Sequence, residues 1–209
     1  MAEIGCRLYL ISPPVIDLAA FGDQLRAALD GGDVASFQLR LPGADDETVL
    51  RAADALIAIV QDRDVAFLLE GRAGLAKQLG CDGVHITSED SVSALRKQIG
   101  ADLILGVGCG ASTHAAMEAG EAGADYVSFG PFFDSANTRS AERVDVDVLR
   151  NWALTMTIPS VAIGGITIQN CPNLVRAGAD FLAVLGAVWT HQAGPKAAVA
   201  ALNAAIAGA

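Results

Sequence analysis

Three segments of this chain share one local form: "LGCDGVHI" (79–86), "AGADYVSFG" (122–130) and "AGADFLAVLG" (177–186). In each, a glycine closes a helical stretch, a two-residue link ending in aspartate follows, and an apolar strand begins. A glycine just past a helix tolerates the left-handed conformation that ends the helix. A link this short turns the chain directly back into a sheet. The repeated form therefore predicts helices that alternate with strands.

The same alternation extends along the whole chain. Short apolar runs are predicted to be strands at residues 7–12, 36–41, 66–70, 83–86, 103–108, 126–130, 160–165 and 181–186. Most are apolar almost without a break, which is typical of parallel strands buried on both faces. Alanine- and leucine-rich stretches such as residues 46–63 lie between them, and a last helix is expected from Pro195, at a plausible first helical position.

Eight strands in strict alternation with helices favour a compact (β/α)₈ TIM barrel, an α/β fold, over a doubly wound sheet. The chain has 209 residues and no linker-like change of composition, so we expect a single domain over residues 1–209. In such barrels the reactive groups lie at the C-terminal ends of the strands and in the loops that follow. Polar residues at these ends are the candidate site.

Composition narrows the range of partners. Fourteen Lys and Arg residues against 24 Asp and Glu give a net charge of −10, which argues against general nucleic-acid or anionic-membrane binding but leaves room for a local phosphate site. The four cysteines are scattered and form no CxxC pair, as expected for free thiols in a reducing cytoplasm. No signal peptide or membrane span is recognised. We expect a cytoplasmic protein, with a homo-oligomer among its possible states.

Glycines at two strand ends suggest phosphate binding. Gly164 and Gly165 end the seventh predicted strand, and Gly186 ends the eighth. Glycine lets backbone N–H groups approach an anion closely, and the ends of strands seven and eight commonly hold phosphate in barrels. The alternative is that these glycines only serve tight turns.

The second predicted strand carries Gln38 and Arg40, two residues apart and so on the same side. An unpartnered arginine in an apolar strand is costly, and gripping a phosphate with two N–H groups would explain it. A salt bridge to a core carboxylate is the alternative. After the sixth strand, Ser135, Thr138 and Arg139 offer donors to phosphate oxygens, although a lid or a solvated polar loop would have the same composition.

The segment "ITSED" (86–90) follows the fourth strand and supplies oxygen ligands of the kind that Mg²⁺ prefers. Asp90 could bind Mg²⁺, or Ser88 or Asp90 could cap the next helix. His85 is expected to be a hydrogen-bonded core histidine. Cys109 is expected to face the site, but not to act as a catalytic thiol because no histidine base is evident nearby.

The ordered set "FQLR", "GCDGVHITSED", "AGADYVSFGPFF", "IPSVAIGGI" and "AGADFLAVLGAV" resembles the thiamine phosphate synthase and thiazole tautomerase family over almost the whole chain. The resemblance implies a (β/α)₈ transferase of thiamine biosynthesis. It would join a hydroxymethylpyrimidine diphosphate to a thiazole phosphate with the help of Mg²⁺, through a pyrimidine cation that the thiazole nitrogen captures.

The resemblance also assigns roles by position. It implies that Gln38 and Arg40 bind the diphosphate and the pyrimidine and that Asp90 is one of two Mg²⁺ aspartates. The phosphate contacts implied for the other positions fall on Ser135, Thr138, Gly165, Leu185 and Gly186.

Several positions depart from the family pattern. The motif lysine is replaced by Pro42, the second metal aspartate by Gly71, and the phosphate-binding serine after strand eight by Gly186. We hypothesise that Glu70 replaces the missing aspartate as a metal ligand and that Arg139 replaces a lysine. Each lost bond to a charged group costs about 1.5–3 kcal/mol. The alternative is therefore a divergent barrel that binds a phosphorylated small molecule with altered or lost synthase activity, or a scaffold that keeps only the barrel.

Overall fold

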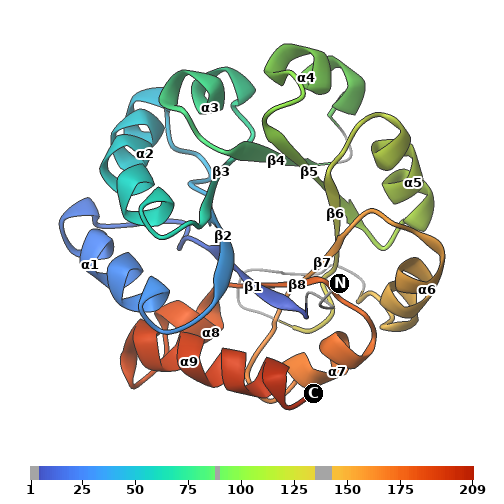
Figure 1. The fold of residues 1–209 in the computed structure, drawn as a ribbon. Helices are drawn as coiled ribbons and strands as arrows, with labels where there is room; N and C mark the ends of the chain where they lie inside the picture. Colours follow the sequence, from blue (N-terminus) through green and yellow to red (C-terminus); the bar gives the residue numbers. More distant parts are fainter. Residues whose placement is uncertain (1–4, 88–89, 135–142) are drawn as a thin grey trace.

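The computed structural model describes residues 5–87, 90–134 and 143–209. Eight parallel strands pair in sequence order and close into a barrel, because β8 pairs back onto β1 (Figure 1). The strands are β1 (Arg7–Ile11), β2 (Val34–Leu39), β3 (Ala66–Glu70), β4 (Gly83–Thr87), β5 (Ile104–Gly110), β6 (Tyr126–Phe129), β7 (Ser160–Ile163) and β8 (Phe181–Val184). The predicted (β/α)₈ barrel is confirmed.

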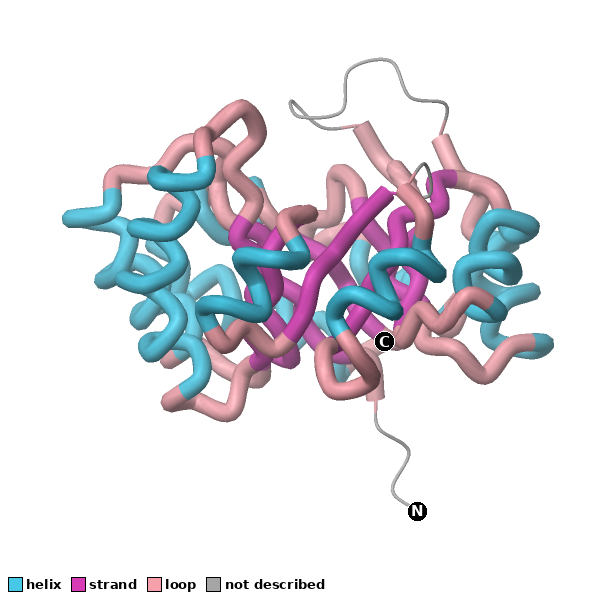
Figure 2. Tube along the Cα trace, turned by 90° about the horizontal axis from the view of Figure 1, so that it is seen from above, coloured by secondary structure: helices cyan, strands magenta, loops and turns pink. Residues whose placement is uncertain are grey.

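Helices surround the strands on the outside of the barrel (Figures 1 and 2). They are α1 (Leu18–Leu29), α2 (Asp46–Gln61), α3 (Ala73–Leu79), α4 (Val92–Ile99), α5 (Thr113–Glu121), α6 (Asp147–Thr155), α7 (Cys171–Arg176), α8 (Gly186–Trp189) and α9 (Gly194–Ala207). The short helix α8 directly after β8 is additional to the alternation expected from the sequence. Pro195 lies in the first turn of α9, as predicted.

The three repeated junctions turn as their glycines predict. Gly80, Gly123 and Gly178 have φ angles of 71°, 102° and 92°, in the left-handed region that favours glycine. The aspartate that follows each glycine has a role that the sequence pattern did not reveal: its carboxylate accepts the backbone N–H of a residue near the start of the preceding strand. The three bonds are Phe67 to Asp82 (2.7 Å), Leu105 to Asp125 (2.7 Å) and Ser160 to Asp180 (2.8 Å).

The barrel has two apolar layers because side chains alternate along each strand. The larger layer lies between strands and helices and contains Phe37, Phe67 and Phe129. A smaller cluster fills the interior of the barrel: Tyr9, Ile11, Leu68, Tyr126, Val161 and Ala183. Residues on the inward positions that follow this cluster toward the C-terminal strand ends reach the mouth of the barrel. Among the described helices, none is long and apolar enough to cross a membrane.

Candidate functional site

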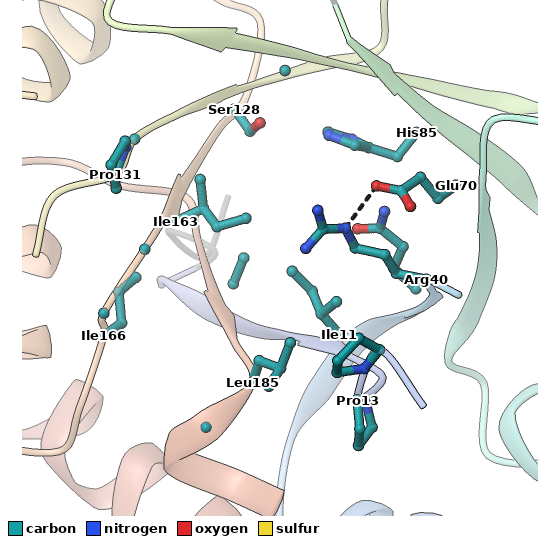
Figure 3. Close-up of a pocket in the computed structure, with 18 of the residues that line it drawn as sticks. Ile11, Pro13, Arg40, Glu70, His85, Ser128, Pro131, Ile163, Ile166 and Leu185 are labelled. Carbon is teal, nitrogen blue, oxygen red and sulfur yellow. Dashed lines mark hydrogen bonds and ion pairs between the residues drawn. The ribbon is translucent and has the colours of Figure 1, made fainter. Parts of the chain in front are cut away.

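A cavity of about 1110 Å³ opens at the C-terminal ends of the strands. Residues from the ends of the strands and from the loops after them line it, and Figure 3 shows their side chains around a common space. All eight residues that were predicted for the site and lie in the described part of the chain converge there: Gln38, Arg40, Glu70, Asp90, Gly164, Gly165, Leu185 and Gly186. Ser135, Thr138 and Arg139 lie outside the described residues, so their roles stay predictions.

Arg40 and Glu70 form an ion pair at the mouth. Nε of Arg40 donates to Oε1 of Glu70 at 2.7 Å, and the two side chains are 41% and 33% exposed (Figure 3). Arg40 follows the last residue of β2, and Glu70 is the last residue of the neighbouring β3. The carboxylate partner considered from the sequence is therefore present. Because only Nε is engaged in this pair, the terminal nitrogens of the guanidinium remain as donors for an anion.

Ser12 fixes the backbone of Arg40. Its hydroxyl oxygen accepts the N–H of Arg40 at 2.9 Å and donates to the carbonyl of Arg40 at 3.1 Å. Ser12 is fully buried directly after β1, so the start of the β2–α2 loop is tied to the neighbouring strand. The backbone that carries Arg40, and with it the ion pair to Glu70, is therefore held in place by hydrogen bonds to Ser12.

Four polar side chains are linked across the barrel interior below the cavity. The hydroxyl of Tyr9 donates to Oε1 of Gln38 at 2.9 Å and lies 3.0 Å from the hydroxyl of Tyr126, which lies 2.9 Å from Nδ1 of His85. The imidazole of His85 also stacks on Tyr126, with ring centroids 5.7 Å apart. His85 is hydrogen-bonded, as predicted, and it also lines the cavity.

Burial sets the protonation of these groups. Burial, together with the positive charge of Arg40, lowers the pKa of His85 to about 4, so its imidazole is neutral at neutral pH. Burial raises the pKa of Tyr9 and of Tyr126, so both phenols keep their protons. Sequence reasoning missed both tyrosines. The available signal was their inward position on β1 and β6, in phase with other residues of the interior cluster.

Glycines form the opposite side of the mouth, after β7 and β8. Gly164 and Gly165 have φ angles of 100° and 62°, and a Cβ on either would lie 2.4–2.5 Å from atoms of the β6–α6 loop. Both glycines are thus required for the turn itself, which was the alternative considered from the sequence. Gly186 differs, because a Cβ there would meet nothing within 4 Å. It opens α8, which is held to β1 by a bond of 2.6 Å from the indole N–H of Trp189 to the carbonyl of Ile11.

Asp90 faces the cavity and does not cap α4. Its carboxylate accepts the N–H of Thr87 at 3.2 Å and the hydroxyl of Thr87 at 3.3 Å. The residue before α4 is Ser91, whose side chain makes no capping bond. Ser88, the other capping residue considered, lies outside the described residues. The carboxylate of Asp90 is therefore held at the rim of the cavity, turned back toward the end of β4.

The carboxylates at the mouth suit a shared cation rather than a closed metal cage. In the described ranges, no group of three or more His, Cys, Asp and Glu side chains could hold a metal. Mg²⁺, however, is usually bound by one or two carboxylates together with substrate phosphates and water. Asp90 and Glu70 line the same cavity and fit that requirement, although Glu70 already accepts a bond from Arg40.

Cys109 corrects one expectation. It was expected to face the site, but it is buried in the layer between strands and helices, where burial raises the pKa of its thiol to about 11. Its neighbours Gly108 and Gly110 line the cavity instead, because successive residues of a strand point to opposite faces. All four cysteines of the chain are free.

Comparisons with known proteins agree with this arrangement. The sequence model of the family "Thiamine monophosphate synthase" matches residues 8–188. A thiamine-phosphate synthase of Rhodospirillum centenum is 55% identical over 95% of this chain and 96% of its own length, and one of Hyphomonas neptunium is 47% identical over 95% and 92%. The structure of a thiamine phosphate pyrophosphorylase from Pyrococcus furiosus superposes with a TM-score of 0.84, at 28% identity, over 97% of this chain and 96% of that one.

Proposed function

Because the chain belongs to the thiamine monophosphate synthase family, we propose that the cavity at the mouth of its barrel is where a hydroxymethylpyrimidine diphosphate meets a thiazole phosphate. The enzyme is a transferase of the thiamine-phosphate synthase type, and its products are thiamine phosphate and diphosphate. One observation carries the proposal for the site: Arg40, two carboxylates and the glycine turns after β7 and β8 converge on a single cavity.

The reaction replaces one bond at the methylene carbon of the pyrimidine. The bond from this carbon to the diphosphate oxygen breaks, the diphosphate leaves with the electron pair, and a pyrimidine cation remains. The lone pair of the thiazole nitrogen then forms the new C–N bond. Negative charge grows on the leaving diphosphate, so groups that bind it more strongly as it departs accelerate the step.

Arg40 is the residue that we assign to the departing diphosphate. Glu70 holds its Nε at 2.7 Å, so the guanidinium is oriented before the substrate binds and its free N–H groups can grip phosphate oxygens in pairs. The neighbouring Gln38, also on the cavity wall, is assigned to the pyrimidine ring. Both assignments follow the sequence expectation.

The glycine side is assigned to the thiazole phosphate. Gly164, Gly165, Leu185 and Gly186 line the cavity after β7 and β8. Residues without side chains let a phosphate approach the backbone N–H groups closely. This division places the two phosphorylated substrates against opposite sides of one cavity, which brings the thiazole nitrogen toward the pyrimidine carbon.

Magnesium belongs to the same proposal, with Asp90 and Glu70 as its ligands. When bound, Mg²⁺ neutralises charge on the diphosphate and makes it a better leaving group. The described lining supports the need for a cation. Its one Arg or Lys side chain is Arg40, whereas three of its side chains are carboxylates: Glu70, Asp90 and Asp134. Arg143 compensates Asp134, since its Nε donates to that carboxylate at 3.0 Å.

The coupling assay tests the function directly. Purified protein is mixed with the two substrates and Mg²⁺, and thiamine phosphate and diphosphate are measured over time. We expect both products in equal amounts, and loss of the reaction when a chelator removes Mg²⁺. No product at high enzyme concentration would contradict the proposed function, and binding of thiazole phosphate without turnover would favour the divergent barrel instead.

The cellular setting is also a proposal. We place the enzyme in the cytoplasm, since all four cysteines are free and three of them are buried, as in proteins of compartments that keep thiols reduced. A homo-oligomer stays among the possible states, and sedimentation of the purified protein would measure it.

A further inference from the structure

The two tyrosines of this chain are both in the barrel interior, and both belong to the hydrogen-bonded series that joins Gln38 to His85. The interior is shaped to hold them. A Cβ on Gly106 would lie only 1.9 Å from Cζ of Tyr126, so the missing side chain on β5 provides the room for the phenol. The rings of Tyr9 and Tyr126 meet edge to face, with centroids 6.0 Å apart.

Counting protons along this series fixes the direction of every bond. The single proton of Tyr9 is donated to Oε1 of Gln38. The bond between the tyrosines must then use the single proton of Tyr126, whose oxygen has no second proton for His85. The remaining bond, between Tyr126 and Nδ1 of His85, therefore takes its proton from the imidazole. A neutral His85 thus carries its proton on Nδ1.

The two ends of the series consequently present opposite hydrogen-bonding groups. With its oxygen turned to Tyr9, Gln38 has its NH₂ group left as a donor. With its proton on Nδ1, His85 has a bare lone pair on Nε2 as an acceptor. Nε2 points to the part of the cavity wall formed by Gly108, where a Cβ would lie 3.4 Å from it. Figure 3 shows His85 at this wall, opposite Ile163.

We propose that Tyr9 and Tyr126 are positioning residues, which fix Gln38 as a donor and Nε2 of His85 as an acceptor for the pyrimidine substrate. This rests on the proposed function. An aminopyrimidine ring offers the complementary pair, a ring nitrogen that accepts and an amino N–H that donates. As the ring becomes cationic, its amino N–H becomes a stronger donor, so an acceptor at His85 binds the cation more tightly than the starting diphosphate.

Nitrogen NMR of the imidazole tests the proposal on the free protein. Protein labelled with ¹⁵N-histidine at neutral pH distinguishes a protonated from an unprotonated ring nitrogen, and a His85→Gln variant identifies the signals. We expect Nδ1 to be protonated and Nε2 to be bare in His85. A spectrum in which Nε2 carries the proton as the main form would overturn the proposal before any tyrosine variant is made.

The variant Tyr9→Phe gives the sharper test, because the hydrogen bonds of Tyr9 go to Gln38 and Tyr126 rather than to His85, and phenylalanine keeps the ring packing. Without the Tyr9 hydroxyl, the proton of Tyr126 becomes available to Nδ1, so the proton of His85 should move toward Nε2. The matched control is Leu68→Met, which perturbs the same interior cluster without changing a hydrogen bond and should leave the tautomer as it is. An unchanged tautomer in a folded Tyr9→Phe protein would count against the relay.

Steady-state kinetics connects the tautomer to the substrate. In Tyr9→Phe and Tyr126→Phe we expect kcat/KM for the pyrimidine diphosphate to fall about tenfold, the equivalent of one hydrogen bond, through a higher KM and a lower kcat. The KM for thiazole phosphate should be unchanged. An equal rise in both KM values would indicate a merely structural role. The tautomer of His85 is measured without substrate. Failure of the coupling reaction would therefore contradict the proposed function but would leave the assignment of the His85 proton to Nδ1 intact.

Discussion

The two sides of the mouth offer an anion different kinds of group. On the side of β2 to β4, the candidate groups are the side chains of Arg40, Glu70 and Asp90. On the side of β7 and β8, they are backbone groups beside Gly164, Gly165 and Gly186. The first side owes its chemistry to charge, which a substitution can change while the fold stays the same. The second owes it to the path of the chain, which at Gly164 and Gly165 no other residue can follow without strain.

This contrast separates two kinds of departure from the family pattern. Some change a charged side chain that could bind substrate, and others would change the path of the backbone. Side-chain recognition can be lost one group at a time, as the family resemblance implies for Pro42 and Gly71. Backbone recognition is retained as long as the turn is. The glycine side is therefore expected to bind phosphate even where the charged side has diverged.

Removing the charge of Arg40 should have the largest effect. Arg40→Gln is expected to lower kcat/KM roughly 10²–10³-fold, because the guanidinium contributes most as the diphosphate departs. The free energy of unfolding should change little, since the ion pair with Glu70 is about one-third exposed or more. Kinetics and thermal denaturation measure the two effects. Arg40→Lys keeps the charge but not the paired N–H groups, so its kcat/KM should fall less than that of Arg40→Gln. Full turnover in Arg40→Gln would refute the role of Arg40 in binding the diphosphate.

The charged side should also make stability depend on pH through His85. Its folded pKa of about 4 lies below the ordinary value of 6.5, so between these pH values the unfolded chain takes up a proton that the folded protein does not. Stability therefore falls as pH drops through this window, by roughly 3 kcal/mol, and the contribution of His85 is constant above it. Denaturant unfolding of the wild type and of His85→Gln at several pH values isolates the contribution of His85 to the free energy of unfolding. If the two proteins showed the same dependence of this free energy on pH, the prediction would be contradicted.

On the glycine side, Gly165→Ala should affect the fold before the chemistry. The φ angle of 62° and a Cβ placed 2.4 Å from the carbonyl oxygen of Asp134 predict a loss of about 1–3 kcal/mol in the free energy of unfolding. Urea denaturation measures it. Gly186→Ala is the matched control, since a Cβ there meets open space, and equal losses in the two variants would show that the contrast is wrong.

The smallest effect is expected from adding a side chain where space allows it. Gly186→Ser restores the hydroxyl implied by the family resemblance, at a position with nothing within 4 Å of a new Cβ. One added hydrogen bond to a phosphate contributes about 1 kcal/mol, so the KM for thiazole phosphate should fall roughly fivefold. A rise in that KM would mean that the phosphate does not lie against the start of α8.

Most of the fold could be predicted because each strand is marked by a pattern of neighbouring residues in the sequence. Each predicted strand lies within two residues of an observed one at both ends, since continuous apolar runs and terminating glycines are features of neighbouring residues. The aspartate links were harder. The pattern shows Asp82 after Gly80, but its bond to Phe67 joins residues that only the closed sheet brings together.

The site could be predicted as a place but not as a set of contacts. That Arg40 and Glu70 would share a cavity follows from the rule that strand ends meet at one mouth. That they would pair with each other depends on the register of β2 against β3, which no single strand encodes. Cys109 was misplaced for a similar reason, because the alternation of β5 depends on which face Gly108 takes. The hydrogen-bonding role of Tyr9 and Tyr126 could not be predicted, because in the sequence they are ordinary residues of apolar strands.

The pairing of β1 with β8 also bears on how the protein is made. Residues 7–11 leave the ribosome long before their partners at residues 181–184, because most of the barrel lies between them in the sequence. Until β8 emerges, β1 presents a row of unpaired N–H and C=O groups, and an open edge of this kind can join strands of other nascent chains. Slow translation of the segment that ends in β8 would prolong that exposure, whereas release of β8 ends it by removing the edge altogether. The closed sheet thus protects this chain only once β8 has been made.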